Sequence, residues 1–167
     1  QMSFRRGVMS LVILGLLKKE DIKLREQDPY YMERVKLFMN EVGKQLADLQ
    51  ISKGGNIIMV QVENEPGTWG SVRDYSKKAQ KLFEGSIPQE ILTPTVCKEL
   101  NVPKNAKGSW KEVFGERADE YFHAWHVARY INYVAKAGKE IYPLPLYINV
   151  ALRDPLTNPT ADHYESG

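Results

Sequence analysis

The chain has 167 residues, of which 43% are hydrophobic and 26% are charged, and its formal net charge at pH 7 is +2. A domain of this length can bury one hydrophobic core, because it removes roughly 70% of its unfolded surface from water. The small charge, with no basic run that alternates with stacking aromatics, argues against a nucleic-acid-binding protein. The single cysteine, Cys97, excludes an internal disulfide and a zinc site built from cysteines.

The first 17 residues partly resemble a secretory signal peptide. Arg5 and Arg6 precede an apolar run over residues 8–17, but Lys18 follows at once without a small-residue cleavage site. This run is also shorter than the about 20 residues that a membrane-spanning helix needs, so we expect no stable membrane span. Two interpretations stay open: a signal remnant, as in a secreted or periplasmic protein, or a segment of the folded domain, which we favour.

A helix is predicted from Asp28, a good N-cap, and Pro29, a good first helical residue, through residue 50. Gly54 and Gly55 then interrupt the helical pattern, and the β-branched run over residues 56–63 predicts a strand that Pro66 and Gly67 must end. The apolar stripe that should pack this helix on a sheet is Tyr31, Val35, Phe38, Val42, Leu46 and Leu49.

The second half of the chain predicts a further helix and strand after a long insertion. Residues 71–84 are typical of a short helix closed by Gly85, and three prolines divide residues 86–108. A capping-box pattern at Ser109 and Glu112 precedes a long helix from Ala118 to about Lys139. Residues 144–150 predict the next strand, and the helix–strand–helix–strand order implies parallel neighbours in an α/β sheet.

The strand over residues 56–63 leads directly into Glu63, Asn64 and Glu65. Catalytic side chains collect at the C-terminal ends of parallel strands, where loops can surround a substrate. Regular alternation would put Glu63 and Glu65 on the face of Gln61, with Asn64 opposite. Asn64 and Glu65 can therefore both face a substrate only if the strand bends or bulges.

Residues 54–65, with residues 28–35 before them, closely resemble the acid/base region of glycoside hydrolases of clan A, in particular the retaining β-galactosidases of family 35. Residues 16–25 also fit that family. From Pro66 onward the chain is similar to a divergent branch of the same hydrolases, so either a mosaic sequence or an intermediate family member would give this pattern. The segments similar to that branch are residues 70–76, 122–126 and 142–147.

The resemblance implies a partial (β/α)8 TIM barrel, roughly from helix 3 to strand 5, with the whole chain as one fragment of a catalytic domain. It assigns Glu65 as general acid/base and Asn64 as the partner of the sugar 2-hydroxyl. The nucleophile of the family is a glutamate that ends strand 7. We expect that strand to be absent from this chain, the isolated chain to be inactive and the missing part of the barrel to be its partner.

Other side chains are candidate substrate contacts by position. Tyr147 and Asn149 lie at the end of the second predicted strand, although a packed tyrosine and a turn-capping asparagine are the favoured alternatives. Trp69 and Trp110 would border the pocket from loops. For Glu63, an interior carboxylate bonded to a neighbouring strand is favoured over direct substrate contact.

The remaining expectations concern metal, cofactor and sugar specificity. His123 and His126 lack an acidic partner at metalloprotease spacing, so we expect no metal and no cofactor. Pro66 stands where β-galactosidases of the family carry tyrosine, and this puts the preference for galactose in doubt. One alternative to a β-galactosidase-like enzyme is a catalytically inactive carbohydrate-binding or assembly fragment. Another is a flavodoxin-like domain, which is weakly supported because the sequence has no phosphate-binding glycine loop.

Overall fold

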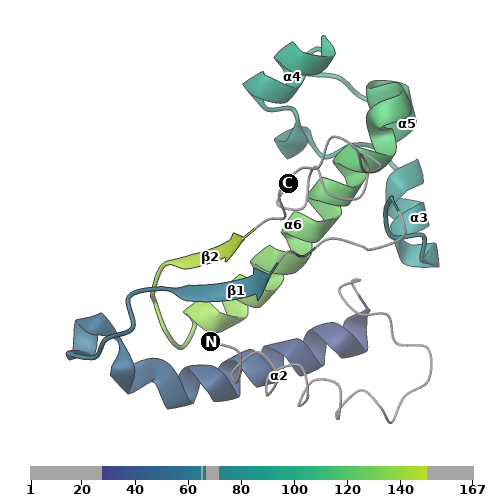
Figure 1. Ribbon diagram of the computed structural model, residues 1–167. Coiled ribbons are helices and arrows are strands. Elements are labelled where there is room, and N and C mark those ends of the chain that lie inside the picture. Colours follow the sequence, from purple (N-terminus) through teal and green to yellow (C-terminus); the bar gives the residue numbers. More distant parts are fainter. Residues whose placement is uncertain (1–27, 65, 67–71, 150–167) are drawn as a thin grey trace, which may run out of the picture. The chain divides into compact units, whose positions relative to one another are not determined.

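The computed structural model describes residues 28–64, 66 and 72–149, and these have a mixed α/β structure, as predicted. The chain divides into two compact units. The strand unit contains the described residues up to Asn64 together with Arg129–Asn149, and the helical unit contains those between Glu65 and Ala128. Helix α6 (Ala118–Lys139) supplies residues to both units (Figure 1).

The strand unit begins with α2 (Pro29–Leu46), which starts where the sequence predicted. The Asp28 side chain caps the helix, because its Oδ1 accepts a hydrogen bond from the Tyr31 backbone N at 2.9 Å. Two 3-10 turns follow, η1 (Ala47–Leu49) and η2 (Ile51–Lys53). The helix thus ends earlier than predicted, and Leu49 is 52% exposed instead of packed on the sheet. The residues of α2 that are buried are Tyr31, Val35, Met39 and Gly43.

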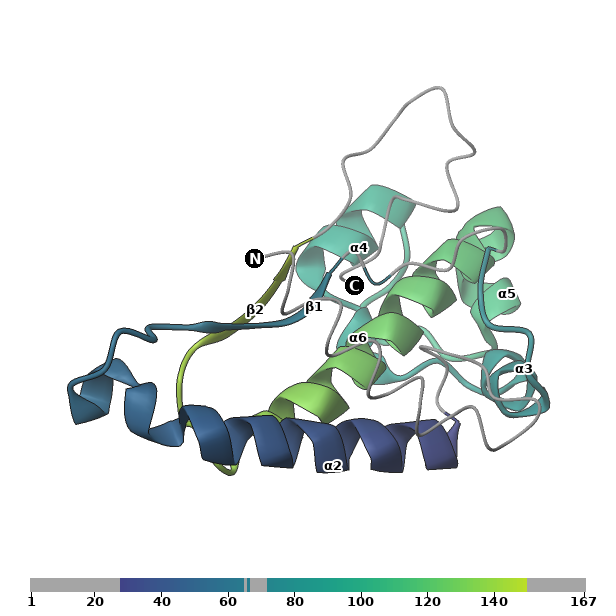
Figure 2. The same ribbon diagram turned by 60° about the horizontal axis from the view of Figure 1, so that its bottom comes forward.

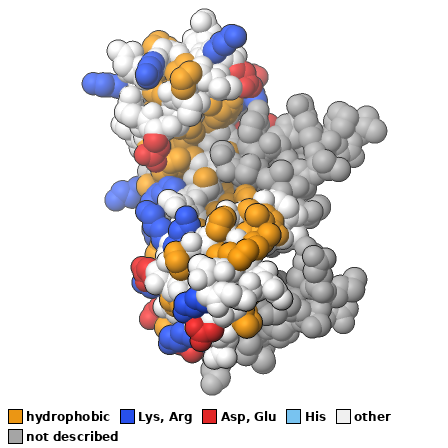
Figure 3. All heavy atoms as spheres, turned by 90° about the vertical axis from the view of Figure 1, so that its left-hand side faces the viewer, with side chains coloured by type: hydrophobic (Ala, Val, Ile, Leu, Met, Phe, Trp, Pro, Cys, Tyr) orange, Lys and Arg blue, Asp and Glu red, His pale blue; other side chains and the backbone are white. Residues whose placement is uncertain are grey.

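Strands β1 (Val60–Asn64) and β2 (Leu146–Asn149) pair in parallel, which confirms the predicted βαβ arrangement. Figure 1 shows both arrows pointing the same way. Strand β1 begins four residues later than predicted, and Ile58 and Met59 before it are 55% and 48% exposed. Figure 3 views the molecule from the side where η1 and η2 lie in Figure 1 and shows hydrophobic side chains at its surface. The apolar run before β1 therefore lies on the surface of the strand unit instead of in a strand.

The pairing of β1 with β2 contains an irregularity. Val60 lies opposite Leu146 and Gln61 opposite Tyr147, but Ile148, the next residue of β2, lies opposite Glu63 and not Val62. One extra residue, Val62, is therefore accommodated on β1, which is the pattern of a β-bulge. This bulge decides which side chains share a face at the ends of the two strands.

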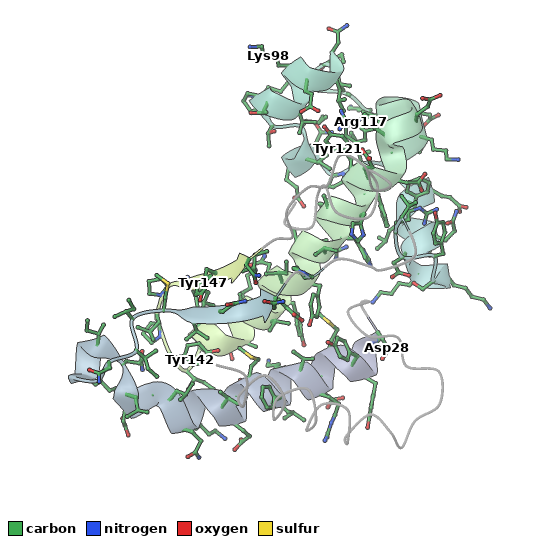
Figure 4. All side chains as sticks on the ribbon, in the orientation of Figure 1. Asp28, Lys98, Arg117, Tyr121, Tyr142 and Tyr147 are labelled. Atoms are coloured by element: carbon green, nitrogen blue, oxygen red, sulfur yellow. The ribbon has the colours of Figure 1, made fainter. Side chains whose placement is uncertain are left out.

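The core of the strand unit closes around Tyr142, which is 1% exposed (Figure 4). Its ring occupies space that two glycines leave open, Gly43 on α2 and Gly138 on α6. A Cβ atom at Gly43 would lie 2.7 Å from Tyr142 Cε1, so neither helix could come as close to the ring with a larger residue. Figure 2 shows α2 passing alongside the C-terminal end of α6.

The helical unit holds shorter helices around the first part of α6. These are α3 (Lys77–Glu84), α4 (Pro94–Leu100) and α5 (Trp110–Phe114), with 3-10 turns η3 (Gln89–Ile91) and η4 (Gly115–Arg117). The predicted capping box is confirmed, because the Ser109 side chain accepts from Glu112 N and the Glu112 carboxylate accepts from Ser109 N. Gly85 follows α3 as predicted, and α6 has the predicted bounds.

Aromatic side chains dominate the core of the helical unit. Trp110 is fully buried, and its ring meets Phe122 edge to face with centroids 5.2 Å apart. The expectation that Trp110 borders a pocket from a loop was therefore wrong, because the tryptophan lies on the first turn of α5 and faces inward. Trp125 is half-buried against the same core. Among the described residues, no helix is both long and apolar enough to cross a bilayer.

Candidate active site at the ends of the parallel strands

Three amide side chains meet where β1 and β2 end. Gln61 Nε2 lies 2.6 Å from Asn149 Oδ1 and 3.4 Å from Asn64 Oδ1, and it also donates to the Glu63 backbone carbonyl at 3.1 Å. All three amides are half-buried. Two of the predicted site residues, Asn64 and Asn149, are thus brought together by a third side chain that sequence reasoning had not selected. We refer to Gln61, Asn64 and Asn149 as the amide cluster.

The β-bulge explains how Gln61 and Asn64 come to share a face. In a regular strand, residues three apart point to opposite faces. The extra residue between Gln61 and Glu63 shifts this alternation by one, so Asn64 joins Gln61 and pairs with Asn149 on β2. A bulge is therefore present, just before Glu63, and it places Asn64 on the face of Gln61. The predicted bend that would let Asn64 and Glu65 share a face cannot be followed, because Glu65 lies outside the described residues.

Glu63 makes its contacts toward helices of the strand unit. Its Oε1 accepts a hydrogen bond from the Tyr130 hydroxyl of α6 at 2.7 Å, and the Tyr130 and Tyr31 hydroxyls lie 3.1 Å apart. Burial, followed by the nearby Glu63 carboxylate, raises the pKa of Tyr130 well above its usual value. Tyr130 therefore keeps its proton and acts as a donor. Glu63 Oε2 also accepts from the Asn64 backbone N at 3.2 Å.

The other predicted site residues divide into two groups. Tyr147 is on β2 opposite Gln61 and is 44% exposed (Figure 4). Glu65, the predicted acid/base, and Trp69 lie outside the described residues, as does the segment 1–17. Pro66, which lies between Glu65 and Trp69 in the sequence, is described and is buried. The described part of the site is therefore the amide cluster with Tyr147 beside it.

A second polar group lies inside the helical unit. His126 Nε2 and Asp74 Oδ2 are 3.2 Å apart with both side chains at most 5% exposed. Burial alone would raise the pKa of Asp74, but hydrogen bonds from His126 and Ser76 outweigh it and lower the pKa to about 2. Arg73 Nε pairs with Asp119 at 2.5 Å, and its guanidinium lies 3.9 Å from the centre of the Phe83 ring. These groups find their bonding partners within the unit.

His123 is buried beside this network, and its Nε2 has no hydrogen-bond partner among the described residues. Burial, with a smaller contribution from His126, lowers its pKa to about 4, so the ring is neutral near pH 7. Over the described ranges, no group of three or more histidine, cysteine or acidic residues is arranged to hold a metal ion. On α6, the His126 ring stacks on Phe122 with ring centroids 5.2 Å apart.

Gln61 is the residue that sequence reasoning missed. Its position two residues before Glu63 on the same strand was visible, but its reach to Asn149 depends on the bulge and on the pairing of β1 with β2, which join residues 88 positions apart. A polar residue inside an otherwise apolar strand was the signal available in the sequence.

Comparison with known proteins identifies the family of this chain. Residues of this chain are 32% identical over 80 residues to "Beta-galactosidase 17" of Arabidopsis thaliana, and 37% and 35% identical over 78 residues to the "Beta-galactosidase" proteins of Bos taurus and Homo sapiens. These alignments cover 46–48% of this chain but 12% of each relative. The chain thus matches about an eighth of the length of these curated relatives. The family model described as "Glycosyl hydrolases family 35" matches residues 14–139, and the chain therefore belongs to glycosyl hydrolase family 35.

Proposed function

We propose that this chain is part of the catalytic barrel of a retaining glycosidase that acts on β-galactosides or related sugars. The observation that carries this proposal is the amide cluster, which lies at the C-terminal ends of two adjacent parallel strands. Hydrogen-bonding side chains at that edge are suited to sugar hydroxyls, and in a barrel the same edge holds the catalytic groups. Membership of family 35 and likeness to named β-galactosidases support the reaction class.

In this proposal α2, β1, α6 and β2 are helix 3, strand 4, helix 4 and strand 5 of the eightfold barrel, and residues 1–167 are one fragment of that domain. A complete barrel needs roughly 250 residues. Parallel sheets normally have both faces covered, and a barrel leaves no open edge. The exposed Ile58, Met59 and Tyr147 are consistent with this requirement, because further strands and their loops would cover them.

Glu65 is proposed to be the general acid/base. Its carboxyl group donates a proton to the leaving oxygen while a second carboxylate attacks the sugar carbon and the glycosidic bond breaks. Glu65, now ionised, then takes a proton from the water that displaces this nucleophile from the sugar. The nucleophile would be supplied by sequence other than the described residues, from another strand of the barrel.

Asn64 is proposed to bind the sugar 2-hydroxyl, and Asn149, Tyr147 and Trp69 to complete the substrate contacts. The hydrogen bonds of Glu63 support a different role for this residue. Its carboxylate accepts from Tyr130 and from the Asn64 backbone N, so it would hold the end of β1 against α6 instead of contacting the sugar.

The test uses the complete protein that carries this chain, with Glu65→Gln as the variant and two aryl β-galactosides as substrates. A dinitrophenolate leaves without protonation, whereas phenolate needs the proton that a general acid supplies. We expect the variant to lose roughly 100-fold or more in kcat/KM on the phenyl substrate and far less on the dinitrophenyl one.

Two results would overturn the proposal. Equal losses on both substrates would mean that Glu65 is not the proton donor. No activity of the wild-type protein on any aryl glycoside, with retained binding of galactose, would favour the alternative of an inactive carbohydrate-binding or assembly component.

A further inference from the structure

We infer that Gln61 is a positioning residue that fixes the side-chain amide of Asn149 with its NH2 group toward the substrate. This inference rests on the proposed function for the identity of the ligand but on the amide cluster alone for its geometry. It predicts that this edge of the sheet presents hydrogen-bond donors to a ligand. The sugar substituents that bind there should therefore be hydrogen-bond acceptors.

The orientation of the Gln61 amide is set by the backbone. A backbone carbonyl can only accept a hydrogen bond, and the Glu63 carbonyl lies 3.1 Å from the end of the Gln61 side chain. The group at that end must therefore be the NH2 group and not the oxygen. Because the β-bulge brings this carbonyl within reach of Gln61, the bulge itself determines the direction of the amide.

The second proton of Gln61 Nε2 then determines the orientation of Asn149. The shortest contact of the cluster, 2.6 Å, joins this nitrogen to the Asn149 side chain, and a donor there requires an acceptor opposite. Asn149 must therefore present its Oδ1 to Gln61. Its Nδ2, with two protons, is directed away from Gln61.

Asn64 is held more loosely by the same nitrogen. The separation of Gln61 Nε2 from Asn64 Oδ1 is 3.4 Å, and both protons of the nitrogen already serve the two closer acceptors. A shared, weak interaction is what remains. Gln61 therefore biases Asn64 toward the same orientation but fixes Asn149.

Two consequences follow for a ligand at the edge of the sheet. The sugar oxygen that meets Asn149 must accept a hydrogen bond, and its own proton must go to another group. Fluorine can accept weakly but cannot donate, so a fluorine at that position should be tolerated better than a hydrogen. Reversing the Asn149 amide would remove this difference, because an Asn oxygen facing the sugar needs a donor.

The experiment measures inhibition constants for galactose and for its singly deoxygenated and singly fluorinated analogues with the complete protein. In the wild type, one ring position should bind the fluoro analogue clearly more tightly than the deoxy analogue. Gln61→Glu replaces the NH2 group by an oxygen of nearly the same shape and should turn the Asn149 amide. We expect that variant to bind galactose roughly tenfold more weakly, the effect of one lost donor, and to lose the fluoro preference at that position.

Two further variants distinguish the effect of the Asn149 amide orientation from the effects of an added charge at residue 61 and of a damaged fold. Asn149→Asp puts an oxygen where the NH2 group was and should abolish the same fluoro preference while Gln61 is intact. Gln50→Glu changes a second glutamine of the strand unit, which is buried and whose Nε2 donates to the Ala47 carbonyl at 2.6 Å, and should lower stability without changing the preference.

A second measurement tests the orientation of the Asn149 amide without any ligand. It therefore remains informative if no galactose analogue binds and the proposed function fails. In the protein labelled with 15N at its asparagine and glutamine side chains, the Gln61 NH2 protons should be protected from exchange and those of Asn149 should not. In Gln61→Glu the Asn149 protons should become protected. Protected Asn149 protons in the wild type, or a fluoro preference that survives Gln61→Glu, would overturn the inference.

Discussion

The polar side chains of the two units differ in burial and in accessibility to a ligand. In the helical unit Arg73, Asp74 and His126 are buried and bonded to one another or to neighbours within the unit. In the strand unit the amide cluster is half-exposed at the ends of two strands, with its donors and acceptors ordered by a backbone carbonyl. Buried polar groups that satisfy one another stabilise a fold, whereas oriented groups left accessible are available to a ligand. Strength of interaction alone therefore does not identify the functional region.

Removing Arg73 should give the largest loss of stability. We expect Arg73→Met to lower the free energy of unfolding by about 3 kcal/mol, because it leaves the Asp119 carboxylate and the Asp74 carbonyl without their buried partner. Urea denaturation measures this. If the helical unit is purely structural, the variant that remains folded should keep the leaving-group dependence of the wild type.

Arg117→Met is the matched control, since Arg117 is 37% exposed at its side chain and pairs with the exposed Glu99 at 2.7 Å and more loosely with Glu120 at 3.3 Å (Figure 4). An exposed ion pair contributes less than about 1 kcal/mol. Equal losses for the two arginine variants would contradict the distinction between a buried and a solvated network.

Acid should destabilise the helical unit through His123. The unfolded chain binds a proton at this histidine near pH 6.5, whereas the folded pKa is about 4, so lowering the pH between these values favours unfolding. The gap of 6.5 minus 4 corresponds to roughly 3 kcal/mol at most, lost as the pH falls from 7 to 4. Asp74 loses its contribution mainly below this window, because the unfolded carboxyl takes up a proton near pH 3.8 while the folded one stays ionised until the pH approaches about 2.

Unfolding curves at several pH values, compared between the wild type and His123→Gln, measure this contribution. The variant should show a clearly smaller change between pH 7 and 4. An unchanged pH dependence in the variant would show that His123 is not the group responsible.

Closing the space around Tyr142 should destabilise the strand unit by about 2 kcal/mol, the range for overpacking a core. In Gly138→Ala the new methyl group would collide with the Tyr142 hydroxyl and ring. Tyr142→Phe removes that hydroxyl, which has no hydrogen-bond partner among the described residues, and should recover part of the loss. A double-mutant cycle in urea measures the coupling, and strict additivity would mean that the two residues do not collide.

The smallest effect should come from the helix-facing side of β1. Glu63→Gln and Tyr130→Phe should each cost about 1 kcal/mol of stability, the typical contribution of a hydrogen bond. The double variant should cost less than the sum, because Tyr130→Phe removes the same 2.7 Å bond that Glu63→Gln weakens by replacing a charged acceptor with a neutral one. If Glu63→Gln instead lowered kcat/KM by orders of magnitude with normal stability, Glu63 would belong with the substrate contacts.

Local features of this fold and the parallel order of its strands were predictable from the sequence, but contacts between particular side chains far apart in the chain were not. The Asp28 cap and the capping box at Ser109 depend on residues three positions apart, so their pattern is visible in the chain. The β-bulge depends on how β1 pairs with β2, and the burial of Trp110 depends on Phe122 of another helix. Sequence reasoning thus selected Asn64 and Asn149 but not Gln61, which links them.

A crystal structure of the complete protein with bound galactose tests the central claim most directly. We expect the sugar to bind beside the amide cluster, with Asn64 and Asn149 within hydrogen-bonding distance of its hydroxyls. The Glu65 carboxyl should lie near the anomeric oxygen. Galactose bound elsewhere, with the amide cluster covered by other parts of the protein, would contradict it.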